Sequence, residues 1–141
     1  MTTHNNGTFT FLATTDISAR TKGRAVSSKE FNEDASVGWV PANLGIGPLG
    51  HIVEGIPYDA TGDIRMVADP NSAYEIAGIP NIPAFTLCFA DLMNTDGTVW
   101  ESCARNFLKR AVDELRERHG ITMTAAFEHE FTERHARGST H

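Results

Sequence analysis

One segment, residues 102–119, has the clear period of an amphipathic helix, and it constrains the fold more than any other feature of the sequence. Apolar residues recur there at intervals of three and four and form one stripe, made of Leu108, Ala111, Val112 and Leu115. Ser102 is the expected N-cap, and Gly120 stands where a C-terminal cap glycine belongs. Because burial contributes roughly 1.5–3 kcal/mol for each large apolar side chain, we expect this stripe to pack against the rest of the domain.

The segments around the helix are short and alternate between apolar and polar residues, which is typical of β-strands. Strands are expected at residues 9–17, 23–27, 63–68, 74–78, 84–91 and 121–131. The Asp96-Gly97 pair predicts a hairpin turn. One long helix packed across one mixed sheet is a small α+β domain. The polar ends of the chain, residues 1–7 and 132–141, are expected to be disordered.

The length and charge of the chain argue against several classes of protein. Its 141 residues suffice for one domain with a core. The formal net charge of −6 argues against nucleic acid and anionic membranes as partners, because binding to phosphates needs clustered Lys and Arg. The longest apolar run, residues 82–90, is too short to span a bilayer, and the N-terminus has no features of a secretory signal. We therefore expect a cytoplasmic protein in which Cys88 and Cys103 are buried or idle thiols rather than a disulfide.

Residues 38–58, GWVPANLGIGPLGHIVEGIPY, contain five glycines and three prolines, yet most of the other residues are apolar. This composition, without a helical period, predicts a long loop that packs or closes against something. Two interpretations fit the pattern: an ordinary structured loop, or a flap over a functional site.

Glu128 and Glu130 stand one residue apart in the apolar stretch AAFEHEF, so strand geometry places them on one face with Cβ atoms about 7 Å apart. Two carboxylates that close repel each other when both are ionised and poorly solvated. They can face water, share a proton, or hold a cation between them. Hard divalent ions such as Mg²⁺ and Mn²⁺ prefer carboxylate oxygens.

Four stretches in the same order as in a known family resemble the glutamine synthetases. The segment CFADL carries Asp91, and the helix ARNFLKRAVDEL carries Arg105 at the family's arginine. The segment Glu128–Phe131 matches the family's Glu-x-Glu-Phe strand, and GDIRMVADP places Asp63 and Asp69 at two family acids, with an alanine in place of a proline. The resemblance covers most of residues 8–131 and is clearest after Gly62.

The resemblance implies a β-grasp-like domain over residues 8–120, followed by the first strand, 121–131, of a truncated catalytic domain. In that family the two glutamates, here Glu128 and Glu130, bind paired Mg²⁺ or Mn²⁺ ions that hold ATP. Glutamate is phosphorylated and then attacked by ammonia or an amine, within a ring of subunits. Arg105 would contribute to ATP binding or to an interface, or would be a plain surface residue. No catalytic residue is assigned to this chain.

The chain departs from the family pattern in two places. The family's ammonium-binding aspartate falls near residues 49–52, where no acid stands, so either Glu54 substitutes for it or the amine is larger and less polar. Trp39 is a candidate in the same loop, with core packing as its other role. The chain also ends eleven residues after Glu130, before the remaining family ligands. We therefore expect no tightly bound cofactor and no ligase activity from this chain alone.

Two other hypotheses stay open from the sequence. A stand-alone β-grasp interaction module could associate with full-length relatives and modulate them. A small metal-binding protein is less favoured, because the sequence shows only two good ligands and a metal site needs more.

Overall fold

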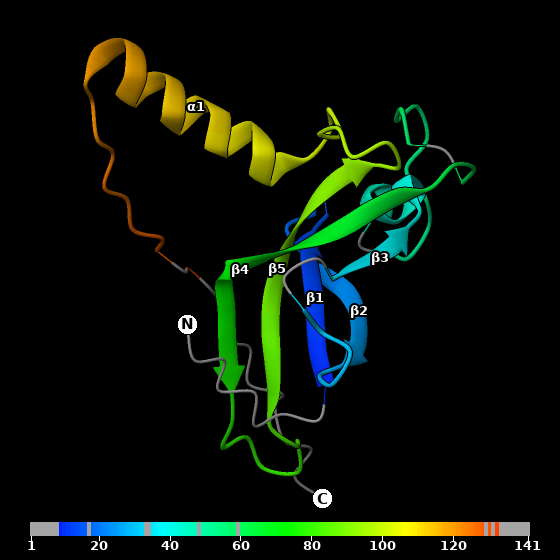
Figure 1. Cartoon of the computed structure of the whole chain (residues 1–141). Coiled ribbons are helices and arrows are strands. Elements are labelled where there is room, and N and C mark those ends of the chain that lie inside the picture. The colour runs from blue at the N-terminus through cyan, green and yellow to red at the C-terminus, as the bar shows by residue number, and fades with distance from the viewer. Residues whose placement is uncertain are drawn as a thin grey trace, which may run out of the picture.

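The computed structural model describes residues 9–16, 18–32, 35–47, 49–58, 60–128, 130 and 132. The elements are β1 (Phe9–Thr15), β2 (Thr21–Ser27), β3 (Ser36–Trp39), a 3-10 helix (Pro41–Gly45), β4 (Ile64–Ile76), β5 (Phe85–Asn94) and α1 (Ala104–His119). The five strands form one sheet in the order β2-β1-β5-β4-β3 (Figure 1). β1 and β5 run parallel, whereas the other neighbours run antiparallel. The expected α+β class with a mixed sheet is confirmed.

The core lies on one face of this sheet and is closed by the start of the loop after β3. Three residues of the central strands, Leu12, Cys88 and Ala90, are fully buried. Trp39 and Leu44 pack into the same cluster from the loop side. The start of the long segment, up to Gly45, is therefore part of the core, which explains its apolar residues there.

β4 is one long strand interrupted by a bulge, where the sequence predicted two separate strands at residues 63–68 and 74–78. Its pairing with β5 shifts register between Ala68 and Ala73. Ser72 holds the bulge to the sheet, because its Oγ lies 2.8 Å from the carbonyl oxygen of Asp69 and 3.0 Å from that of Phe89. Proline has no N–H to donate to a ladder, so Pro70 is tolerated at such a position.

The boundaries of α1 agree closely with the prediction, but its packing does not. The N-cap is Cys103 rather than Ser102, and Gly120 adopts the left-handed conformation (φ 64°) expected of a C-terminal cap. The prediction that the helix packs across the sheet is wrong: α1 has no buried residue, and Leu108 is 55% exposed. Figure 1 shows α1 projecting away from the end of β5. No residue of the apolar stripe is buried, and even Val112 and Leu115 are only partly covered.

Residues 121–128 follow α1 as an exposed extended segment, with no strand pairing described for them. A strand needs a partner for its backbone N–H and C=O groups, and the expected partner belongs to a catalytic domain. The domain division at residue 120 therefore stays a prediction. Residues 1–7 and 133–141 lie outside the described residues, so their expected disorder stays a prediction.

Candidate functional site: an ionic joint between sheet and helix

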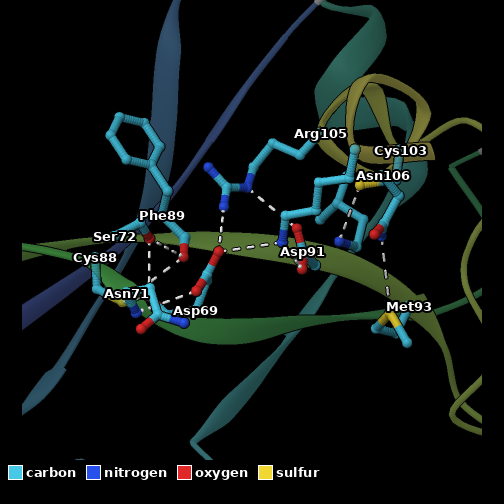
Figure 2. A network of polar contacts seen from close by, with 12 residues as sticks. Asp69, Asn71, Ser72, Cys88, Phe89, Asp91, Met93, Cys103, Arg105 and Asn106 are labelled. Carbon is cyan, nitrogen blue, oxygen red and sulfur yellow. Dashed lines mark hydrogen bonds and ion pairs between the residues drawn. The ribbon is translucent and has the colours of Figure 1, made fainter. Parts of the chain in front are cut away.

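Three of the four stretches that resemble the family meet in a cluster of four charged side chains at the base of α1, in which Asp69, Asp91 and Arg105 are labelled in Figure 2. Asp69 comes from the β4 bulge and Asp91 from β5, while Arg105 and Lys109 lie one turn apart on α1. Arg105 Nη2 is 2.6 Å from Asp69 Oδ2, and Arg105 Nε is 3.1 Å from Asp91 Oδ1. Lys109 Nζ is 3.1 Å from Asp69 Oδ2 and 2.6 Å from Asp91 Oδ2. Each cation thus bridges both carboxylates.

The local structure positions the charged side chains of the cluster so that they face one another. Within the bulge the N–H of Asn71 donates to Asp69 Oδ1 at 3.1 Å, which fixes the carboxylate. The guanidinium carbon of Arg105 lies 5.7 Å from the centre of the Phe89 ring, close enough for a cation–π contact. Residues four apart on a helix share a face, so Arg105 and Lys109 reach the sheet together.

The contacts of the cluster favour the charged forms of Asp69 and Lys109. Burial would raise the pKa of Asp69, but the hydrogen bonds from Lys109 and from the Asn71 N–H outweigh it and lower that pKa. Burial would lower the pKa of Lys109, yet its bonds to Asp91 and Asp69 raise it instead. Two cations and two anions then balance. The cluster joins α1 to β4 and β5 through these ion pairs.

A second ionic cluster, which sequence reasoning missed, ties the β1–β2 turn to the long loop. Arg20 Nη2 donates to the carbonyl oxygens of Ile46 (2.6 Å) and Gly47 (2.8 Å). Lys22 Nζ donates to that of Asn43 (2.9 Å) and pairs with Asp16 Oδ2 at 2.6 Å. The loop carbonyls lie more than twenty residues from Arg20 and Lys22 along the chain, so no local pattern could have revealed these contacts. These contacts favour the interpretation of residues 38–58 as an ordinary structured loop that is anchored to the sheet.

The two other candidates in the loop, Trp39 and Glu54, differ in burial. Trp39 is 6% exposed and packs in the core, and its buried indole Nε1 has no hydrogen-bond partner among the described residues. Glu54 is exposed. The tip of the loop carries Leu49, which is 86% exposed. A role of Trp39 or Glu54 toward an amine stays a prediction.

Glu128 and Glu130 are both exposed. No group of three or more His, Cys, Asp or Glu side chains that could hold a metal ion occurs in the part of the chain that the structure describes. The two glutamates alone would not fit a complete Mg²⁺ site, which needs six oxygen ligands. Their role as two of the ligands stays a prediction.

Two expectations from composition can be compared with the structure. Cys88 and Cys103 are both buried free thiols, as expected. Burial raises the pKa of the Cys88 thiol. Among the described residues, no helix has the length and apolar character needed to cross a membrane.

Comparison with known proteins matches residues 3–100 to the glutamine synthetase N-terminal domain. A solved crystal structure of a novel glutamine synthase homolog is similar with a TM-score of 0.69 and 31% identity, over 84% of this chain and 29% of that one. The chain thus spans less than a third of that relative. Curated protein sequences give no significant match. Since the family match covers well over half of its residues, the chain belongs to the glutamine synthetase family.

Proposed function

We propose that the chain is the N-terminal domain of a glutamine synthetase-like, ATP-dependent ligase that joins glutamate to ammonia or an amine through γ-glutamyl phosphate. The observation that carries the proposal is the match of residues 3–100 to that family's N-terminal domain. The unburied stripe of α1 and the unpaired segment 121–128 also support it, because both need further protein to cover them.

In this proposal Glu128 and Glu130 supply two of the carboxylates that hold Mg²⁺ or Mn²⁺, and the remaining ligands come from the catalytic domain. Bound metal ions would neutralise the phosphates of ATP and the developing charge of phosphoryl transfer. Since the described residues offer no complete metal site, we derive no metal-dependent step for this chain alone. Subunits would assemble as a homo-oligomeric ring.

The amine acceptor is proposed to be less polar than ammonium. A group that binds ammonium and removes its proton must be an anion or a strong base, and residues 49–52 contain no acid. The exposed side chain there is the apolar Leu49. If ammonium is the acceptor instead, Glu54, the nearest acid along the loop, is the residue that would substitute.

The chain alone is expected to show no ligase activity. A coupled assay should detect no ATP- and glutamate-dependent release of phosphate above that of a Glu128→Ala variant, because two exposed carboxylates bind Mg²⁺ too weakly to hold the nucleotide. Turnover well above this control would contradict the proposal that the catalytic machinery lies elsewhere.

A chimera tests the ligase proposal directly. Residues 3–100 would replace the equivalent domain of an active glutamine synthetase, and glutamate-dependent phosphate release would be measured with ammonium and with larger alkylamines. Activity in an assembled chimera supports the proposal, and a preference for alkylamines supports the assigned acceptor. An assembled but inactive chimera contradicts it.

The alternative function is an interaction module that joins and modulates full-length relatives. It is favoured by the apolar side chains that the structure leaves in solvent beyond the sheet, among them Phe107 (67% exposed) and Phe127 (88%). Sedimentation of the chain with and without a full-length relative separates the two functions. Entry of the isolated chain into the relative's ring favours the module.

A further inference from the structure

The attachment of α1 to the sheet is unusual in its chemistry. The helix buries no residue, and among the described elements it packs against the end of β5. Its described side-chain contacts with the sheet are the ion pairs of Arg105 and Lys109, the ring of Phe89 beneath Arg105, and a long contact of 4.0 Å between Asn106 Nδ2 and Met93 Sδ. Charge, rather than apolar burial, therefore holds this helix.

The chain just before α1 is fixed by different means. Cys103 is 2% exposed, and its Sγ accepts the backbone N–H of Leu92 at 3.2 Å. Its own N–H donates to the carbonyl oxygen of Trp100 at 3.0 Å. The backbone is thus anchored up to residue 103, and everything beyond that residue is oriented by the ionic cluster.

We propose that Asp69, Asp91, Arg105 and Lys109 form a latch that sets the direction of α1, and that α1 swings as an intact helix about Cys103 when the latch opens. The four residues are positioning residues. The inference concerns the chain by itself and does not depend on the proposed ligase function.

The latch lies at the base of α1, so a small change there moves the far end of the helix. It lies in the first turns of the helix, and residues 110–119 continue beyond it. At 1.5 Å per residue these add roughly 15 Å, so a small rotation at the base moves the far end of α1 by several ångströms. That end leads directly into residues 121–128. Where that segment lies relative to the sheet is therefore decided at the latch.

An ionic hold responds to salt in a way that an apolar hold does not. The side chain of Lys109 is 44% exposed and that of Arg105 is 29% exposed, so dissolved ions reach both. The Debye length falls to about 3 Å at 1 M salt, which is comparable with the 2.6–3.1 Å separations of these ion pairs, so salt weakens their attraction in part. Salt does not weaken the burial of apolar groups in this way, so the sheet should stay folded while the latch opens.

Residual dipolar couplings in a stretched polyacrylamide gel test the proposal, because they report the direction of each N–H bond. In the unmodified 141-residue chain at low salt, couplings from α1 and from the sheet should fit one common alignment. In an Arg105→Met/Lys109→Met variant the couplings of α1 should collapse relative to those of the sheet, while Cα chemical shifts over residues 110–118 stay helical.

The matched control is Arg116→Met, which breaks an ion pair within the exposed part of α1 and leaves the latch intact. It should keep the common alignment. If the double variant fails to fold, the single Lys109→Met variant and the unmodified chain at 1 M NaCl should show a partial loss of common alignment, because Arg105 still pairs with both carboxylates in the single variant and salt screens contact pairs only in part. Couplings of α1 that still fit the sheet's alignment in these samples would overturn the proposal. Coil-like shifts over residues 110–118 would overturn it as well, because α1 would then melt instead of swinging.

Discussion

Replacing Asp16 by asparagine should lower the free energy of unfolding by about 2 kcal/mol at neutral pH. The Asp16 side chain is fully buried, and Lys22 Nζ lies 2.6 Å from its Oδ2. The backbone N–H groups of Ser18 and Arg20 donate to its Oδ1 at 2.9 and 3.0 Å. Asparagine can keep these backbone bonds through its oxygen, but it presents an uncharged NH₂ group to the cations. The variant therefore isolates the loss of the negative charge, and urea unfolding measures it.

The pH dependence of this effect follows from the pKa of Asp16. Burial would raise that pKa, but hydrogen bonds from Lys22, Arg20 and Ser18 outweigh burial and lower the pKa from 3.8 to about 2. A carboxylate whose pKa is lower in the folded chain stabilises the fold above pH 4, and this contribution disappears as the pH falls from about 4 to about 2. Other carboxylates contribute equally to both proteins, so the difference between unmodified chain and variant should shrink across this window.

Asp113→Asn is the matched control for Asp16→Asn. Asp113 also pairs with an arginine, at 2.6 Å from Arg116, but its side chain is 52% exposed. Exposed pairs contribute less than about 1 kcal/mol, so this variant should unfold almost as the unmodified chain does. If both variants had equal effects, the buried cluster at the β1–β2 turn would not anchor the loop as described.

The elements that sequence reasoning located best are those with local causes. The apolar period and Gly120 defined α1 almost to the residue, and the Asp96-Gly97 turn returns the chain so that Val99 bridges to Met93. Helix caps and tight turns depend on neighbouring residues, which the sequence shows directly.

The features that sequence reasoning missed depend on residues far apart along the chain. The period of α1 correctly marks an apolar face, but it cannot say whether the cover comes from the same domain, and here the described residues do not supply it. Asp69 and Asp91 were noted as family acids, yet their meeting with Arg105 requires the β4 bulge and the pairing of β4 with β5. The anchoring of the loop by Arg20 likewise depends on tertiary contacts.

Replacing Gly23 by alanine should have the largest effect of all, about 3 kcal/mol of lost stability or more. Gly23 lies in β2 opposite Ala13 of β1. A Cβ at this position would stand 1.8 Å from the carbonyl oxygen of Leu12 and 2.8 Å from its carbonyl carbon. Both are backbone atoms, so no rotation of a side chain can relieve the clash. β1 cannot move aside either, because Leu12 is also in register with Cys88 of β5 on its other edge.

Relief must therefore come from β2, which has to lift away from β1 and lose pairing near Gly23. Urea unfolding followed by circular dichroism gives the loss of stability. Ala25→Val is the matched control, since Ala25 is an exposed residue of the same strand, and added methyl groups there should change stability by no more than about 0.5 kcal/mol. A Gly23→Ala variant as stable as the control would mean that β2 does not approach β1 as closely as the described register requires. A large loss confined to Gly23 would show that the close approach of the two backbones, and not the composition of the strand, determines which residue this position accepts.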